Sequence, residues 1–190
     1  MSRAYRITVK ESTTRDIKGS DEICTQLELL EILPPEQMAD LLKGELKNRG
    51  FDETEDGTMT RQDGKITVTV DPCNGEVSVK SEASETVTLE AKREATTYDD
   101  IGPHSSQVRK QVSEQLQRDL EKKAEKETER LQTQATEALE KHLDELQPEL
   151  SQVINKVTRD ALKQKAHQLG TVKEIAEDAE TGSLTIKVEV

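Results

Sequence analysis

The stretch between Ser105 and Leu146 contains neither Gly nor Pro, and this uninterrupted run constrains the fold more than any other feature. Gln, Glu, Lys and Arg, which are good helix formers, fill most of its positions. Apolar or small residues recur about once per helical turn, at Val108, Val112, Leu116, Leu120, Ala124, Leu131, Ala135, Leu139, Leu143 and Leu146. The run therefore predicts one uninterrupted helix of about 42 residues, roughly 60 Å long.

The spacing of this apolar stripe differs from that of a leucine zipper. Ala124, Ala135 and Leu146 are 11 residues apart. Such a repeat corresponds to about 3.67 residues per turn rather than about 3.5. The helix is therefore expected to be a coiled-coil-like arm with a straight or slightly right-handed seam.

A second apolar stripe follows Pro148 and ends at Gly170. Its members are Leu150, Val153, Ile154, Val157, Ala161, Leu162, Ala166 and Leu169. Gln147-Pro148 either kinks one continuous helix or reverses the chain into an antiparallel pair of helices. The absence of Gly at this junction favours the kink. The large aliphatic side chains need a partner, and this favours the hairpin, which we expect.

The segment before residue 103 reads as strands around one helix. Alternating apolar residues predict strands near Tyr5–Val9 and over Asp21–Leu30, separated by Gly19 and Ser20. Pro34-Pro35 ends the second strand and opens a helix whose apolar face is formed by Met38, Leu41, Leu42 and Leu46, with Gly50 just beyond its end.

Further strands follow this helix. Ile66, Val68 and Val70 alternate with Thr, and Asp71 to Gly75 has the composition of a tight reversal. Residues 77–93 continue the alternation as one long strand or as two strands with a bend. The order is thus β-β-α-β-β-β, with one helix covering a mainly antiparallel sheet.

The chain closes with a predicted hairpin. Val172–Glu177 is followed by a turn at 178–182 and by Leu184, Ile186, Val188 and Val190 on one face. Because an isolated two-stranded hairpin is marginally stable in water, it should join the N-terminal sheet or another chain. We therefore expect an α+β protein with three parts: a recognition domain at 1–102, a helical region at 103–169 and the hairpin at 170–190.

Composition limits the classes of function. Hydrophobic residues make up 32% and charged residues 35% of the chain, which has no Trp, one Phe and two Tyr. A deep aromatic-lined pocket is therefore not expected. The formal net charge is −12 at pH 7, and neither half has the basic face that nucleic acid or an anionic membrane requires.

No export signal or membrane-spanning run is apparent, so we expect a cytoplasmic protein with reduced Cys24 and Cys73.

The residues that most often carry chemistry form no catalytic or metal-binding pattern. His104, His142 and His167 have no partner histidine at helical spacing. Cys73, in the expected turn, has no basic neighbour in sequence to activate it. Glu53 to Gly57 resembles a calcium loop only superficially, and it lacks the required spacing. We therefore expect no cofactor and no metal.

The two helical stripes are the main candidate interaction site. They can pack the two helices together, bind a partner or a second copy of the chain, or do both, because the first stripe is longer than the second. The residues assigned to this site are Val108, Val112, Leu116, Leu120, Leu131, Leu139, Leu150, Ile154 and Val157.

One block of sequence resembles a known family. Residues 24–38, CTQLELLEILPPEQM, look like accessory proteins of bacterial ternary systems, and Gly182-Ser183-Leu184-Thr185-Ile186 adds to the likeness. Those proteins are encoded beside AAA+ ATPases of the MoxR or membrane-protease type and von Willebrand factor A proteins. The resemblance implies an ATPase-associated adaptor and brings no catalytic residues.

The sequence thus favours a non-enzymatic adaptor or scaffold that forms homo-oligomers and binds a protein partner, with an AAA+ ATPase as the suggested one. A holdase-like chaperone with exposed aliphatic stripes is the first alternative. An enzyme using scattered carboxylates such as Glu28, Glu31 and Asp71 is the second.

Overall fold

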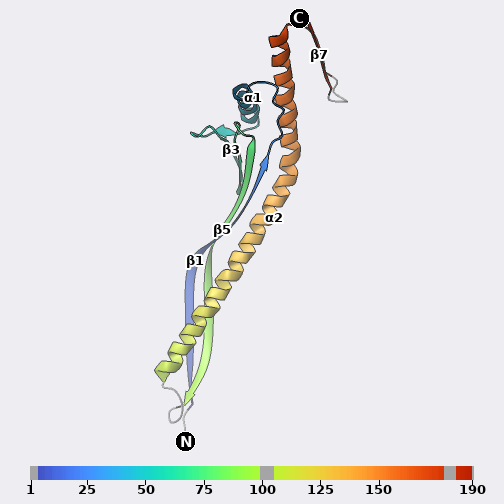
Figure 1. The fold of residues 1–190 in the computed structure, drawn as a ribbon. Coiled ribbons are helices and arrows are strands. Elements are labelled where there is room, and N and C mark those ends of the chain that lie inside the picture. The colour runs from blue at the N-terminus through green and yellow to red at the C-terminus, as the bar shows by residue number, and fades with distance from the viewer. Residues whose placement is uncertain (1–3, 99–104, 178–182, 190) are drawn as a thin grey trace. The chain divides into compact units, whose positions relative to one another are not determined.

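The computed structural model describes residues 4–98, 105–177 and 183–189 (Figure 1). Internal contacts divide the chain into two compact units. Unit 1 comprises Met1–Asp21 and Glu82–Glu137, and unit 2 comprises Glu22–Ser81 and Ala138–Val190. The strands and helices are β1 (Ala4–Gln26), α1 (Pro35–Asn48), β2 (Asp52–Glu53), β3 (Met59–Asp63), β4 (Ile66–Val70), β5 (Glu76–Tyr98), α2 (Ser105–Leu169), β6 (Thr171–Glu177) and β7 (Leu184–Glu189).

The α+β class expected from the sequence is confirmed. Five strands form one sheet in the order β1-β5-β4-β3-β2, and β6 and β7 form a second sheet of two strands. The pairs β2–β3, β3–β4 and β4–β5 are antiparallel. The uninterrupted helix expected over residues 105–146 is also confirmed, because α2 spans all of it.

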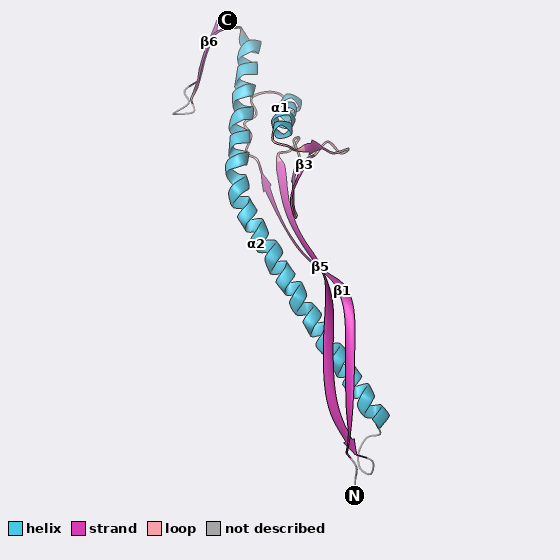
Figure 2. Ribbon diagram, turned by 180° about the vertical axis from the view of Figure 1, so that it is seen from behind, coloured by secondary structure: helices cyan, strands magenta, loops and turns pink. Residues whose placement is uncertain are grey.

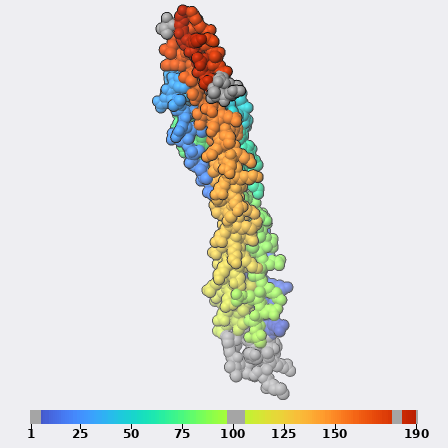
Figure 3. Space-filling view, turned by 90° about the vertical axis from the view of Figure 1, so that its right-hand side faces the viewer, coloured from blue at the N-terminus to red at the C-terminus, as the bar shows by residue number. Residues whose placement is uncertain are grey.

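In unit 1, a ribbon of β1 and β5 packs against α2 (Figure 2). Ile17 and Ala83 of the ribbon form an apolar cluster with Leu131 and Ala135 of the helix. Figure 3 shows the atoms of β5, in green, directly beside those of α2, in yellow. The outward-facing positions of the ribbon are polar, as in the hydrogen bond between Thr14 and Thr88. The ribbon therefore covers the apolar stripe of the helix with one face only.

The ribbon lies very close to α2 at Gly19. A Cβ atom at this position would lie 2.5 Å from the backbone nitrogen of Gln132 and 2.5 Å from the carbonyl carbon of Leu131. At the next residue, the side-chain amide of Gln132 accepts a hydrogen bond from the Ser20 N–H at 3.2 Å and donates one to its carbonyl at 2.7 Å. Glycine is needed because nothing larger fits between the two backbones.

In unit 2, both helices cover the same face of the sheet. The inward-facing side chains of β4 and β5, including Val68, Val70, Val77 and Val79, are fully buried. They form one core with Leu42 and Leu46 of α1 and with α2 residues Leu139, Leu146, Val153, Val157 and Ala161. The aliphatic stripe that follows Pro148 thus contributes to this core.

Helix α1 and the turn at 71–75 have the expected form. Pro35 opens α1, Leu42 and Leu46 are completely buried, and Gly50 has φ of 82° just beyond the helix. Gly75 has φ of 75°, and the Asp71 carboxylate accepts a hydrogen bond from the backbone N–H of Cys73 at 2.9 Å. The turn places β5 beside β4 in antiparallel register.

Two expectations about the strands need correction, and one open alternative is resolved. The two strands expected before residue 30 are one strand, β1, because Gly19 lies at a close approach to the helix and does not end the strand. Of the two alternatives for residues 77–93, the single long strand is confirmed, as part of β5. The short strands β2 and β3 were not expected, because β3 has the sequence MTRQD, with a single apolar residue.

The expected reversal at Gln147-Pro148 is wrong, since Pro148 lies inside α2. Proline removes one backbone donor from a helix, and the helix can continue if packing compensates. The sheet of unit 2 supplies that packing, with Val153 and Val157 buried against it. The second stripe therefore needs no antiparallel helix as its partner.

The C-terminal hairpin is present as β6 and β7, with Val172 opposite Val188 and Ile175 opposite Ile186. Among the described residues it does not join the five-stranded sheet. Glu177 of β6 forms ion pairs with Arg159 and Lys163 of α2. The expected turn at 178–182 and Val190 lie outside the described residues. Attachment of the hairpin to another chain stays a prediction, as does the division into parts at 1–102, 103–169 and 170–190.

Candidate interaction groove

An open groove of about 590 Å³ lies in unit 2 where β1 ends. One wall is the segment that leaves β1, from Thr25 to Glu31, continued by Leu33 and by Pro35 and Met38 of α1. The other wall is the turn from Pro72 to Gly75. The volume falls in the range of about 300–1,000 Å³ that is usual for ligand sites.

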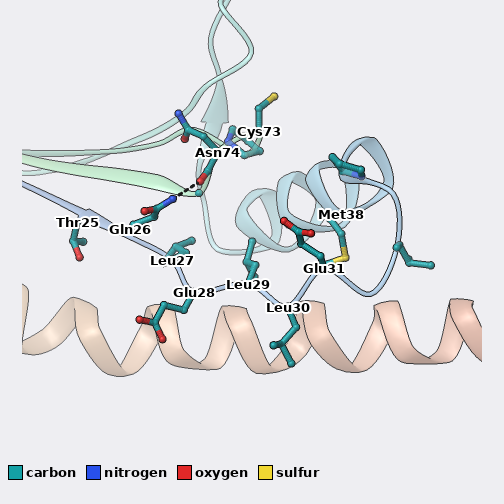
Figure 4. A pocket seen from close by; sticks show the side chains of 14 residues that line it. Thr25, Gln26, Leu27, Glu28, Leu29, Leu30, Glu31, Met38, Cys73 and Asn74 are labelled. Atoms are coloured by element: carbon teal, nitrogen blue, oxygen red, sulfur yellow. Dashed lines mark hydrogen bonds between the residues drawn. The ribbon is translucent and has the colours of Figure 1, made fainter.

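Two hydrogen bonds hold the two walls together, and the walls approach closely at Gly75. The N–H of Leu27 donates to the carbonyl of Gly75 at 2.8 Å, and the Gln26 side chain donates to the carbonyl of Asn74 at 3.1 Å (Figure 4). A Cβ atom at Gly75 would lie 3.1 Å from the Leu27 carbonyl oxygen. The groove is thus built into the end of the sheet.

The apolar side chains of the groove divide into a buried and an exposed set. Leu27, Leu33 and Met38 are buried in the core of unit 2. Leu30 is 64% exposed, and Figure 4 shows its side chain on the opposite side of the segment from Leu29. Ile23, just before the groove on β1, is 38% exposed. Isolated exposed leucines are common, but here Leu30 lies beside a concave surface.

The charged residues that line the groove are all acidic. Glu28 and Glu31 are exposed lining residues, and none of its lining residues, all of which the structure describes, is Lys, Arg or His. The surrounding field is therefore negative, as expected for a chain with a net charge of −12.

A network of charged residues also lies in unit 2 and joins β3 to α2. The Arg61 guanidinium donates to both carboxylate oxygens of Glu149, at 2.7 and 2.9 Å, and to Asp63 at 2.9 Å. It also lies 4.6 Å from the centre of the Phe51 ring. Arg61 faces Val68 across the sheet, so it is on the inner face at the border of the core.

This network shifts the pKa values of its two central groups. The hydrogen bonds from Arg61 lower the pKa of the Glu149 carboxyl, and the hydrogen bonds to Glu149 raise the pKa of Arg61. His142 contributes Nε2 at 3.4 Å from Asp63 Oδ2. The bonds of Arg61 to Glu149 and Asp63 join β3 to α2 and so stabilise the packing of the helix on the sheet.

The helical residues assigned to an interaction site face the chain's own core. Val112, Leu116, Leu120, Leu131, Leu139, Leu150 and Val157 are buried, and Val108 and Ile154 are half-buried. Leu139, Leu150 and Val157 belong to the core of unit 2. Whether any part of the stripe contacts a second chain stays a prediction.

The other singled-out residues are spread over the chain. Cys24 and Cys73 are exposed free thiols, His167 is exposed on α2, and His104 lies outside the described residues. Asp71 does not line the groove that contains Glu28 and Glu31.

The carboxylates of residues 53–57 do not form a calcium loop. Glu55 and Asp56 lie in the β2–β3 connection, whereas Glu53 belongs to β2. Lys43 and Lys47 each bind Glu53 at 2.8 Å and lower the pKa of its carboxyl to about 2.

The described residues contain no group of three or more His, Cys, Asp and Glu side chains arranged to hold a metal ion. No helix among these residues has the length and apolar character needed to cross a membrane.

The groove was not predicted from the sequence, although the sequence contains a signal for it. In Leu27-Glu28-Leu29-Leu30-Glu31-Ile32-Leu33, the alternation of a strand breaks down because apolar residues occur in adjacent pairs. Adjacent apolar residues cannot all lie on one face of a strand. One of each pair must therefore be exposed or packed elsewhere.

The fold is of the α+β class, and unit 2 carries an open surface groove. The model of the family described as FtsH ternary system domain X5 matches residues 1–190, and the chain belongs to this family. The resemblance seen in residues 24–38 is thereby confirmed, and those residues supply one wall of the groove. No curated protein and no solved structure matches the chain.

Membership in this family identifies an accessory domain of FtsH-associated ternary systems and implies protein partners within such a system.

Proposed function

We propose that the chain is a non-enzymatic adaptor that binds a protein component of an FtsH-type AAA+ system in the cytoplasm. The observation that carries the proposal is the family match over residues 1–190. The groove supports it, because an open surface with an exposed Leu30 suits docking better than the enclosure of a small substrate. We also propose that the adaptor forms homo-oligomers, through the half-buried part of the α2 stripe or through the C-terminal hairpin.

A holdase-like chaperone is less well supported than an adaptor. A holdase needs exposed aliphatic surface, and most of the α2 stripe is covered by the chain's own strands. Binding of an apolar dye to the full chain distinguishes the two functions. The adaptor should bind little dye when folded, whereas a holdase should bind it strongly.

The adaptor proposal is tested with the full chain and the purified ATPase portion of the FtsH-type protein from the same organism. Calorimetric titration should show saturable binding, and the ATP hydrolysis rate of the partner should change when the chain is added. Absence of binding to this protein and to the other components of its ternary system would overturn the proposal. Light scattering tests the oligomer, which should have a mass above 21.3 kDa.

A further inference from the structure

We propose that the groove at the end of β1 binds an extended peptide segment in which apolar side chains alternate with Lys or Arg. This inference rests on the proposed function and specifies the chemistry of the partner segment. It is carried by the shape of the groove, by its exposed apolar and backbone groups, and by the sign of its charge.

The groove is lined along one side by a continuous stretch of chain. Its first wall is a consecutive stretch, Thr25 to Glu31, that continues directly from an edge strand of the five-stranded sheet. An exposed strand edge is a common place for a peptide to add as a further strand. A helix is wider and would contact fewer residues of this single segment.

The backbone of this segment has unused hydrogen-bonding groups. Leu27 N–H bonds to Gly75, Leu29 N–H bonds to Leu27, and Ile32 N–H bonds to Leu30. For Glu28 and Leu30, no hydrogen bond of the backbone N–H occurs among the described residues. The Leu29-to-Leu27 bond turns the chain at Glu28, so these residues lie just beyond the regular part of β1. The N–H groups of Glu28 and Leu30 are therefore available to carbonyl groups of a bound peptide.

The side chains of the groove specify the apolar part of the peptide. Leu30 is the most exposed of the large hydrophobic residues that the structure describes, at 64%. Its burial beneath an apolar peptide side chain would remove apolar surface from water, which favours binding. Ile23 extends the apolar surface along β1.

The charge of the groove specifies the polar part of the peptide. Glu28 and Glu31 flank Leu30 in the sequence, and no lining residue is basic. A Lys or Arg on either side of the peptide's apolar residue can therefore approach a carboxylate. An acidic peptide of the same hydrophobicity would meet two like charges, which disfavours it.

The test uses the full chain and a fluorescein-labelled synthetic peptide of alternating Leu and Lys, with a Leu and Glu peptide as its matched control. Fluorescence anisotropy should show saturable binding of the Leu–Lys peptide and at least about tenfold weaker binding of the Leu–Glu peptide. N-methylation of alternate backbone nitrogens should abolish the binding of the Leu–Lys peptide. Equal binding of the acidic peptide would overturn the proposal.

Matched variants locate the binding. The pair Glu28→Lys and Glu31→Lys should weaken binding of the Leu–Lys peptide by about tenfold or more, whereas Glu125→Lys with Glu129→Lys, which changes net charge equally, should weaken it by less than about threefold. Leu30→Asn should weaken binding, and Leu162→Asn should not. Equal effects of the two charge pairs would show bulk electrostatic attraction only and would overturn the groove proposal.

The outcomes separate this inference from the proposed function. If the FtsH-type protein binds the chain and the Leu–Lys peptide does not, the adaptor stands and the peptide chemistry is wrong. If the peptide binds as expected and no component of the ternary system binds, the groove chemistry stands and the proposed partner is wrong.

Discussion

Arg61 of β3 and Glu149 of α2 form a two-bond ion pair, with nitrogen-to-oxygen distances of 2.7 and 2.9 Å. Glu149 directly follows Pro148, the residue that interrupts the hydrogen bonding of the helix. The pair therefore fixes α2 to the sheet at the point where the helix itself is weakest. The ion pair therefore helps to explain why α2 continues past Pro148.

Removal of this ion pair should destabilise unit 2. We expect Arg61→Met to lower the free energy of unfolding by about 1–3 kcal/mol, because hydrogen bonds to charged groups contribute about that much and Glu149 would lose its main partner. Urea unfolding followed by circular dichroism measures the loss.

The control is the pair Arg93–Asp119 of unit 1, whose side chains are 42% and 34% exposed. Arg93→Met should cost less than about 1 kcal/mol, since exposed ion pairs contribute little. Equal losses in the two variants would contradict the role assigned to Arg61.

The same pair predicts a dependence of stability on pH. Because Arg61 lowers the folded-state pKa of Glu149 below its unfolded value, the pair stabilises the fold above the unfolded pKa of about 4.3. This stability is lost as the pH falls through the lowered folded pKa. Urea midpoints measured between about pH 6 and about pH 3 should fall more steeply for the wild type than for Arg61→Met. Parallel curves would argue against the assignment.

Two glycines should respond to alanine in opposite directions. Gly19→Ala places a Cβ atom 2.5 Å from the backbone of α2, and we expect a loss of about 1–3 kcal/mol. Gly44 lies inside α1 with no other atom within 4 Å of a built Cβ. Gly44→Ala should therefore raise stability by about 0.5–1 kcal/mol. Thermal unfolding measures the stability of both variants. An unchanged stability of Gly19→Ala would contradict the close approach.

Pro148 offers a test of the continuous helix. Pro148→Ala restores a backbone donor inside α2 and removes a steric conflict, so stability should rise by as much as about 3 kcal/mol, less the entropy gained by the unfolded chain. A chain that reversed at this position would instead lose a favourable turn residue and become less stable. Urea unfolding distinguishes the two signs.

The sequence predicted the elements whose local signals and packing agree. Helix α1 was predictable because Pro35, the spacing of Leu42 and Leu46, and Gly50 all indicate the same boundaries. The long helix was predictable because residues 105–146 include no Gly or Pro, the residues that most disfavour a helix.

Elements that depend on tertiary contacts were missed. The polar strand β3 forms because it pairs with β4, and α2 passes Pro148 because the sheet and Glu149 compensate. The groove depends on the approach of residues 25–31 to the turn at 72–75, which are distant in the chain. Such approaches leave no periodic signal in one sequence.

The most direct test of the account asks whether the groove touches the FtsH-type partner. The photoreactive residue p-benzoylphenylalanine is introduced at position 30 in place of Leu30, and in a second protein at position 162 in place of Leu162, which is also an exposed leucine. Each protein is mixed with the purified FtsH-type ATPase, irradiated and analysed by mass spectrometry. We expect a covalent adduct with the ATPase from position 30 and none from position 162. An adduct from position 162 alone, or complex formation without any adduct from position 30, would contradict it.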